Sequence, residues 1–275
     1  MSFTTADVVK LRKVSGAGMM DCKNALKDAE GDFDRALEII REKGKLIANK
    51  RADREASEGA VLAKVTADNK FGAVVTLNCE TDFVAKNESF VAFTEKILDA
   101  ALANKVESLD ALKALDLDGV TVETMVTEQT GVTGEKLELS YYNCLSGDTV
   151  VPYIHPGNKL STLVAFNKAD VEVQVGKDVA MQVAAMAPVA VDKDGIPQET
   201  IDKEVEIAKE KYRQEGKPEA MLEKIAMGSL NKWYKEVTLL NQTYVKDGKI
   251  SIKDFLKQND TDLTVTAFDR FTLNA

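Results

Sequence analysis

The chain has 275 residues, of which 29% are charged and 44% hydrophobic, a composition that indicates a folded globular protein and excludes a largely disordered one. The formal net charge of −9 disfavours direct binding to nucleic acid, and no stretch approaches the ~18 consecutive apolar residues that cross a membrane. No basic segment followed by an apolar stretch opens the chain, so we expect a cytoplasmic protein without a membrane partner.

The first 45 residues are predicted to form a small helical module. The expected helices span residues 6–14, 21 to about 31, and 33–43. Thr4 and Thr5 are suited to cap the first helix and Asp32 the third, and Gly44 is placed where a helix usually ends. Three short helices in this length resemble the ubiquitin-associated fold.

A change of charge follows this module. Residues 1–54 contain 12 Lys and Arg against 9 Asp and Glu, whereas the remainder contains 24 against 36. The difference suggests two surfaces with different partners, or ordinary surface variation. Residues 46–58 are rich in charge and lack a sustained apolar face, so they are predicted to be a linker that is partly helical.

The central region contains an internal repeat with an offset of 89 residues. Alternating strand patterns surround Asn69 and, in the second copy, Asn158, and each pair of strands leads to a helical segment, at residues 89–103 and 177–187. We therefore expect an α+β core of two related units, each an antiparallel sheet with helices on one face. The predicted units cover residues 59–145 and, for the second, 146–197 together with 236–275.

Residues 198–235 are predicted to form an antiparallel helical hairpin inserted in the second unit. The two apolar seams have the same 4-3-4 spacing and comprise Ile201, Val205, Ala208 and Tyr212 on one helix and Leu222, Ala226, Ser229 and Trp233 on the other. Gly216 and Pro218 separate the helices. After the hairpin we expect a strand beginning at residues 237–240, a short helix over 252–258 and a final strand over 263–271.

Signals for catalysis are weak. Cys22, Cys79 and Cys144 are far apart and form no CxxC pair, which disfavours a disulfide framework or a zinc site. A thiol or metal hydrolase would have to use Cys79, Glu80, Asp82 or the single histidine, His155. Carboxylates after a strand are more often turn formers than metal ligands, and a lone histidine is more often a turn residue. We expect no enzyme activity, cofactor or metal.

Two apolar features are more typical of an interaction surface. Met19 and Met20 are adjacent beside a glycine-rich loop, so one of them is expected to be exposed unless both fill gaps in a small core. In the strand-to-helix segment at residues 78–87, Phe83 follows Asp82. Phe83 either folds back on the core while Asp82 caps the next helix, or it projects from a rigid scaffold to contact a partner.

Three motifs resemble the elongation factor Ts family in order and spacing. They are Leu11-Arg12 followed by SGAGMMDCK at residues 15–23, NCETDFVAK at residues 78–86, and Tyr153-Ile154-His155 before Leu163-Val164-Ala165. Ser15 departs from the threonine that is more usual in the family. Some members also carry a short C-terminal helical module, and this sequence stops at Asn274-Ala275, so that contact is expected to be absent.

The resemblance implies a guanine-nucleotide exchange factor that binds elongation factor Tu, in its GDP-bound and nucleotide-free forms. It implies that the segment Thr81, Asp82, Phe83 and Val84 enters the partner near its magnesium site. It further implies that Arg12, Met19 and Met20 contact a partner helix, with Lys23 and Lys50-Arg51 near that contact and His155 as a contact in the core. Without the resemblance, an adaptor built on the ubiquitin-associated-like module is the competing hypothesis.

Overall fold

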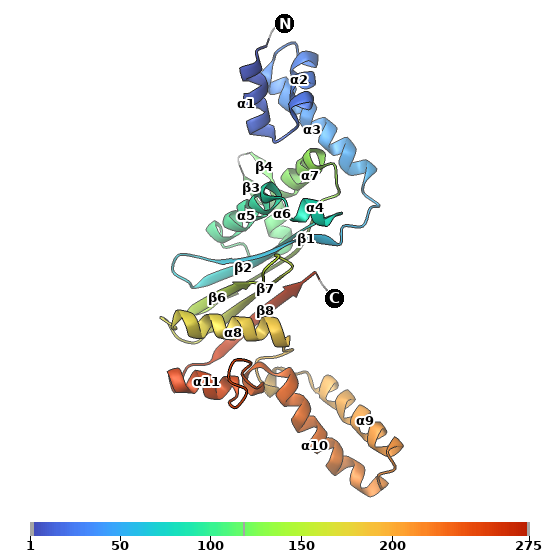
Figure 1. The fold of residues 1–275 in the computed structure, drawn as a ribbon, viewed down its shortest axis with the longest axis vertical. Coiled ribbons are helices and arrows are strands. Elements are labelled where there is room, and N and C mark those ends of the chain that lie inside the picture. Colours follow the sequence, from blue (N-terminus) through green and yellow to red (C-terminus); the bar gives the residue numbers. More distant parts are fainter. Residues whose placement is uncertain (1–2, 118, 274–275) are drawn as a thin grey trace.

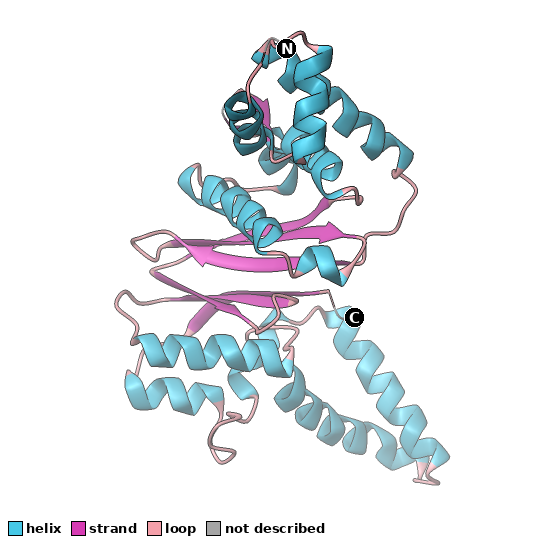
Figure 2. Cartoon of the chain, turned by 45° about the horizontal axis from the view of Figure 1, so that its top comes forward, coloured by secondary structure: helices cyan, strands magenta, loops and turns pink. Residues whose placement is uncertain are grey.

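The structure, a computed structural model, describes residues 3–117 and 119–273 and confirms the α+β fold. The molecule is elongated, with a helical bundle at the N-terminal end, a layered core in the middle and a helical hairpin at the other end (Figure 1). In the core, two sheets lie face to face with helices on their outer sides (Figure 2). The boundaries of the domains within this arrangement stay predictions, and Asn274-Ala275 lie outside the described residues.

The N-terminal bundle consists of three helices, α1 (Thr5–Ser15), α2 (Met19–Asp28) and α3 (Phe33–Lys50). Thr4 begins α1 with a capping box, in which its hydroxyl accepts from the Asp7 amide at 3.3 Å and its own amide donates to the Asp7 carboxylate at 2.8 Å. Asp32 caps α3 as predicted. The helices enclose a small apolar core around Leu11, Cys22 and Leu26.

Two predicted boundaries in this region are wrong. The second helix begins at Met19, before Asp21, because the extended backbone of Gly18 supplies its N-cap. The third helix continues through Gly44 to Lys50, so the first five residues of the predicted linker are helical. Gly44 does not end α3 but is buried within it, at a point where the helix packs closely against the backbone of another helix.

The first core unit contains the antiparallel sheet β1 (Glu58–Val65), β2 (Phe71–Cys79) and β5 (Glu138–Ser146), paired in the order β1-β2-β5. Helix α5 (Glu88–Ala103) packs on its outer face. The chain from β2 to β5 also forms α4 (Asp82–Ala85), α6 (Leu109–Ala114), the strand pair β3 (Asp116–Leu117) and β4 (Val120–Thr121), and α7 (Val122–Thr133).

The second core unit contains β6 (Thr149–Ile154), β7 (Leu160–Phe166) and β8 (Val265–Thr272) in the order β6-β7-β8. Helix α8 (Val173–Met186) covers the outer face of this sheet, and α11 (Ile252–Asn259) lies beside α8 (Figure 1). Residues that are equivalent in the expected repeat make equivalent hydrogen bonds between the two units. Val61 donates its amide to the Asn158 carbonyl at 2.7 Å, and Val150, the residue 89 positions after Val61, donates to the Asn69 carbonyl at 2.6 Å.

The inner faces of the two sheets form a shared apolar layer. Strand β2 is buried along its whole length because one side faces α5 and the other faces the second sheet. Gly72 lies in this layer, where a Cβ atom would lie 2.9 Å from Val150 and 3.1 Å from Leu163. The close stacking of the sheets therefore depends on a glycine at this position.

The predicted hairpin corresponds to α9 (Gln198–Gln214) and α10 (Glu219–Val237), which pack against each other along the predicted seams. The strand predicted at residues 237–240 is wrong. Val237 ends α10, and Leu239–Asn241 forms a 3-10 turn. Two hydrogen bonds hold this turn: the Leu239 amide donates to the Ala190 carbonyl at 2.9 Å, and the Leu240 amide donates to the Val191 carbonyl at 2.9 Å. A short apolar run signals burial without specifying a strand.

Candidate functional site

The segment that joins β2 to α5, residues 80–86, is the first candidate site, and we call it the 80–86 loop. Its first residue is fixed by an ion pair. The Nη1 group of Arg51 donates to both carboxylate oxygens of Glu80, at 2.8 Å each. The Lys136 amide also donates to Glu80 Oε1, at 2.6 Å. The Lys136 amide, followed by Arg51, lowers the pKa of Glu80 below its ordinary value.

The next residue, Thr81, is fixed from a different direction. The Thr81 amide and hydroxyl both donate to the Glu135 carboxylate, at 3.0 and 2.6 Å. The Thr81 hydroxyl also caps α4 by accepting from the Val84 amide at 3.5 Å. Two anchored residues and a capped turn of helix therefore restrain the loop next to Phe83.

Phe83 projects from this frame into solvent. Its side chain is 84% exposed, the largest exposed fraction among the large apolar side chains described as exposed. The two residues that follow it in α4 point the other way: Val84 packs against the core of the first unit and Ala85 is buried in it. Of the two alternatives that the sequence left open, folding back onto the core is therefore wrong for Phe83.

Asp82 lies beside Phe83 and does not cap the following helix, a role that Asn87 fulfils. Its carboxylate accepts from Lys86 Nζ at 2.6 Å, and this bond lowers the pKa of Asp82 below its ordinary value. The pair is exposed and one turn apart, which makes it easy to break. Asp82 is thus a charged group that an incoming partner can use.

The turn between β6 and β7 approaches the 80–86 loop from the second unit. Lys159 pairs with Glu58 of β1 at 2.8 Å, and its charge also contributes to lowering the pKa of Asp82. His155 is exposed at the start of the same turn, where its amide donates to the Leu160 carbonyl at 2.9 Å and its Nδ1 lies 3.0 Å from the Tyr153 hydroxyl. The predicted contact in the second unit and the loop therefore share one side of the core.

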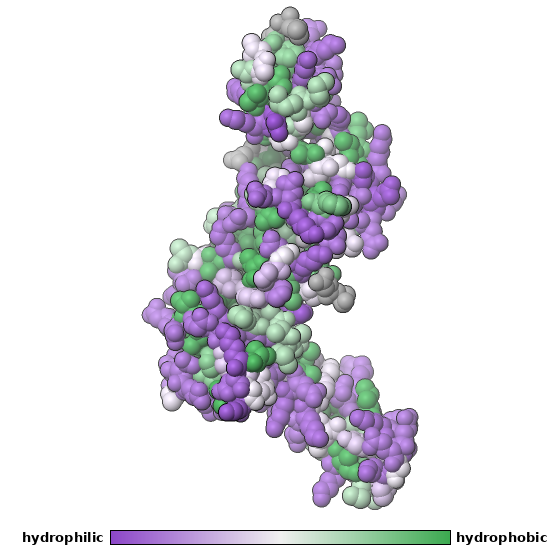
Figure 3. Space-filling model, viewed as in Figure 1, coloured by the Kyte–Doolittle hydropathy of each residue, from purple (hydrophilic) through white to green (hydrophobic). Residues whose placement is uncertain are grey.

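The N-terminal bundle carries a second apolar surface. Met19 and Met20 are 39% and 64% exposed at the start of α2, so neither fills the small core. Arg12 and Lys23 are exposed as well. Figure 3 shows apolar patches between hydrophilic areas on this bundle. The four predicted residues thus lie at a surface of the bundle, and Asp21, next to Met20, pairs with Lys43 in the second half of α3.

The hydrolase hypothesis has no geometric support. Burial raises the pKa of the Cys79 thiol to about 12, so it is not a thiolate near neutral pH. Glu80 and Asp82 are paired with Arg51 and Lys86. Among the described residues, no group of three or more His, Cys, Asp and Glu side chains is placed to hold a metal ion. Within the same residues, no helix has the length and apolar character needed to cross a membrane.

Comparison with known proteins decides the family. The family model described as Elongation factor TS matches residues 80–275. The chain belongs to the elongation factor Ts family. It is 52% identical over 274 residues to elongation factor Ts of Azobacteroides pseudotrichonymphae, an alignment that covers 100% of this chain and 99% of that protein. It is 53% identical over 277 residues to that of Porphyromonas gingivalis, with 100% of both chains covered.

Membership of the elongation factor Ts family makes this chain a translation elongation factor and confirms the resemblance seen in the three motifs. The matched residues include the 80–86 loop and the turn that carries His155, and the full-length relatives extend the likeness to the N-terminal bundle. The sequence reasoning placed Arg51 near the N-terminal contact and did not foresee that it anchors Glu80, and it missed Glu135 altogether. Neither stands in a motif with its partner, since they are separated from Glu80 and Thr81 by 29 and 54 residues.

Proposed function

We propose that this chain binds elongation factor Tu and promotes the release of GDP by inserting the 80–86 loop near the partner's magnesium and phosphate site. The observation that carries the proposal is the exposure of Phe83 on a loop whose neighbours are fixed. An aromatic side chain that is exposed to water in the free protein contributes favourable burial free energy only when a partner covers it. The anchored frame means that little conformational freedom is lost on binding.

The exchange activity follows from linkage. A protein that binds nucleotide-free elongation factor Tu better than the GDP-bound form must weaken GDP binding by the same factor. In such a nucleotide-binding protein, the magnesium ion and the phosphate contacts hold the nucleotide. Phe83 would displace side chains around that site, and the Asp82 carboxylate would compete for, or disturb, the cation.

No bond is made or broken by this chain in the proposed mechanism, so it acts by binding and not as an enzyme, and it needs no cofactor. The remaining predicted residues form two supporting contacts. Arg12, Met19, Met20 and Lys23 would contact a helix of the partner, and His155 would contact it from the second core unit. Both the GDP-bound and the nucleotide-free partner would be bound, in the cytoplasm.

The decisive measurement is the rate at which fluorescent GDP leaves purified elongation factor Tu, with and without this chain. We expect a large acceleration at catalytic amounts of the chain. An unchanged rate together with tight binding would support the competing adaptor hypothesis. In that case a peptide of residues 1–54 would retain most of the affinity for the partner, whereas the exchange proposal requires the 80–86 loop as well.

A further inference from the structure

The N-terminal bundle is joined to the core by a helix crossing with a glycine on each helix. Gly44 of α3 and Gly131 of α7 meet backbone to backbone. A Cβ atom on Gly131 would lie 2.5 Å from Gly44 Cα and 3.3 Å from the Gly44 amide nitrogen. Both obstructing atoms belong to the backbone, so a side chain on Gly131 would push the two helices apart.

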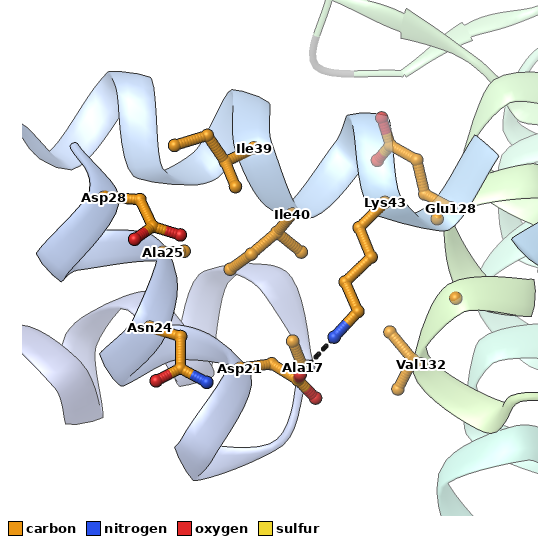
Figure 4. Close-up of a pocket in the computed structure, with 12 residues that line it drawn as sticks. Ala17, Asp21, Asn24, Ala25, Asp28, Ile39, Ile40, Lys43, Glu128 and Val132 are labelled. Carbon is orange, nitrogen blue, oxygen red and sulfur yellow. Dashed lines mark hydrogen bonds and ion pairs between the residues drawn. The ribbon is translucent and has the colours of Figure 1, made fainter. Parts of the chain in front are cut away.

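This crossing is narrow. A cleft of about 260 Å³ lies on one side of it, between α2, α3 and α7, and one of about 280 Å³ lies on the other side. Figure 4 shows the first cleft, with Ile40 and Lys43 of α3 facing Val132 of α7 and the Lys43–Asp21 ion pair across its opening. Next to the crossing, Arg41 approaches Glu128 at 3.1 Å. The bundle therefore rests on the core mainly along one line of contact.

The same two helices hold the 80–86 loop. The residue that follows α3, Arg51, pairs with Glu80. Just beyond the end of α7, Glu135 accepts both hydrogen bonds from Thr81. A shift of α3 relative to α7 would consequently change the position of the Met19–Met20 surface relative to Phe83.

We propose that Gly131 is a positioning residue, which fixes the N-terminal surface and Phe83 at the separation that lets one partner molecule bind both at once. The inference rests on the proposed function. Two contacts on one rigid body bind more tightly than either alone because the second contact forms without further loss of freedom. When the crossing is spread, the N-terminal surface keeps its own small core, but its position relative to Phe83 changes and the joint use of the two contacts is lost.

Three alanine substitutions at helical glycines provide a matched test. Gly131→Ala forces backbone atoms apart. Gly44→Ala places its Cβ 3.4 Å from the Glu128 carbonyl oxygen and 3.5 Å from Glu128 Cα, an ordinary contact, so a much smaller effect is expected. Gly228→Ala, in α10, meets nothing within 4 Å and is the control for the change in helix propensity.

The first readout is the affinity for nucleotide-free elongation factor Tu, measured by titration. We expect Gly131→Ala to weaken it roughly tenfold or more, whereas Gly228→Ala should leave it unchanged. Equal affinities for the Gly131→Ala and Gly228→Ala proteins would overturn the inference.

The second readout separates positioning from simple destabilisation. Met20→Ala should weaken binding in the original chain but add little in the Gly131→Ala chain, where the N-terminal contact is already out of place. Fully additive effects, or no effect of Met20→Ala in the original chain, would refute the positioning role.

If a thermal melt shows that Gly131→Ala does not fold, Gly44→Leu is used to spread the same crossing from the other helix. The apolar core under α7 contains no side chain from α3, so this change does not alter that core directly. The same loss of affinity and the same non-additivity are expected of that variant. Failure of the proposed function is distinguished by Phe83→Ala. If that variant exchanges GDP normally, the proposed insertion of Phe83 into the partner is wrong. If Phe83→Ala is defective while Gly131→Ala binds normally, only the present inference is refuted.

Discussion

Phe83→Ala is expected to slow GDP release while leaving the thermal stability of the free protein unchanged. The side chain is 84% exposed, so its removal opens no cavity. Phe90, seven positions later in α5, is the matched control, since it is 1% exposed in the core of the first unit. Truncation of a buried phenylalanine costs about 3–5 kcal/mol, so Phe90→Ala should melt much earlier than the original chain.

The size of the exchange defect follows from the interface that we propose. Loss of an aromatic anchor that becomes buried on binding typically costs about 2 kcal/mol or more. If this loss falls on the exchange transition state, GDP release at fixed partner concentration should slow on the order of thirtyfold. Stopped-flow release of fluorescent GDP measures the rate, and a thermal melt of the same preparation measures the stability.

Two results would contradict the reasoning. A Phe83→Ala protein that melts far earlier yet exchanges normally when folded would show that Phe83 supports the core. A protein that melts normally and also exchanges at the full rate would show that Phe83 is exposed for some other reason. In either case, the 80–86 loop would no longer be the candidate for insertion into elongation factor Tu.

Further predictions concern the same loop and its surroundings. Asp82→Ala should slow release as well and combine with Phe83→Ala less than additively, and chelation of magnesium should shrink the difference between these variants and the original chain. Deletion of residues 1–50 should leave a folded core that binds elongation factor Tu weakly in a titration. Replacement of residues 201–233 by a short linker should preserve exchange, because α9 and α10 pack mainly on each other. Glu80→Gln should lower the melting temperature at neutral pH. The difference should begin to shrink as the pH falls below the ordinary carboxyl pKa of 4.5 and should vanish only below the lowered pKa of Glu80 in the folded chain, because the carboxylate stabilises the fold only while it is charged.

Local signals in the sequence were sufficient for most of the fold. The capping residues Thr4 and Asp32 begin the helices that they were expected to begin. The repeat predicted two related sheets because a strand pattern with matched turns survives in both copies. These features depend on residues close together in the chain, which is why a single sequence contains them.

The errors arose where a distant contact decides the local structure. Gly44 follows an apolar pattern and resembles a helix end, yet its partner across the crossing, Gly131, lies far along the chain. The same limit applied to Phe83, whose exposure depends on whether the core has room for it. Neither question can be settled by periodicity, because periodicity describes one element and not the space between two.

The repeat itself sharpens the argument for the 80–86 loop. With an offset of 89 residues, Phe83 corresponds to Glu172, which lies just before α8. In the described structure, the segment from β7 to α8 contains no helix, whereas the first unit inserts α4 between β2 and α5. The scaffold shared by both units explains the stacked sheets and the reciprocal bonds of Asn69 and Asn158, and it does not require an exposed aromatic residue at either end. Phe83 is therefore a departure from the duplicated frame, which is where a contact specific to one partner is expected to lie.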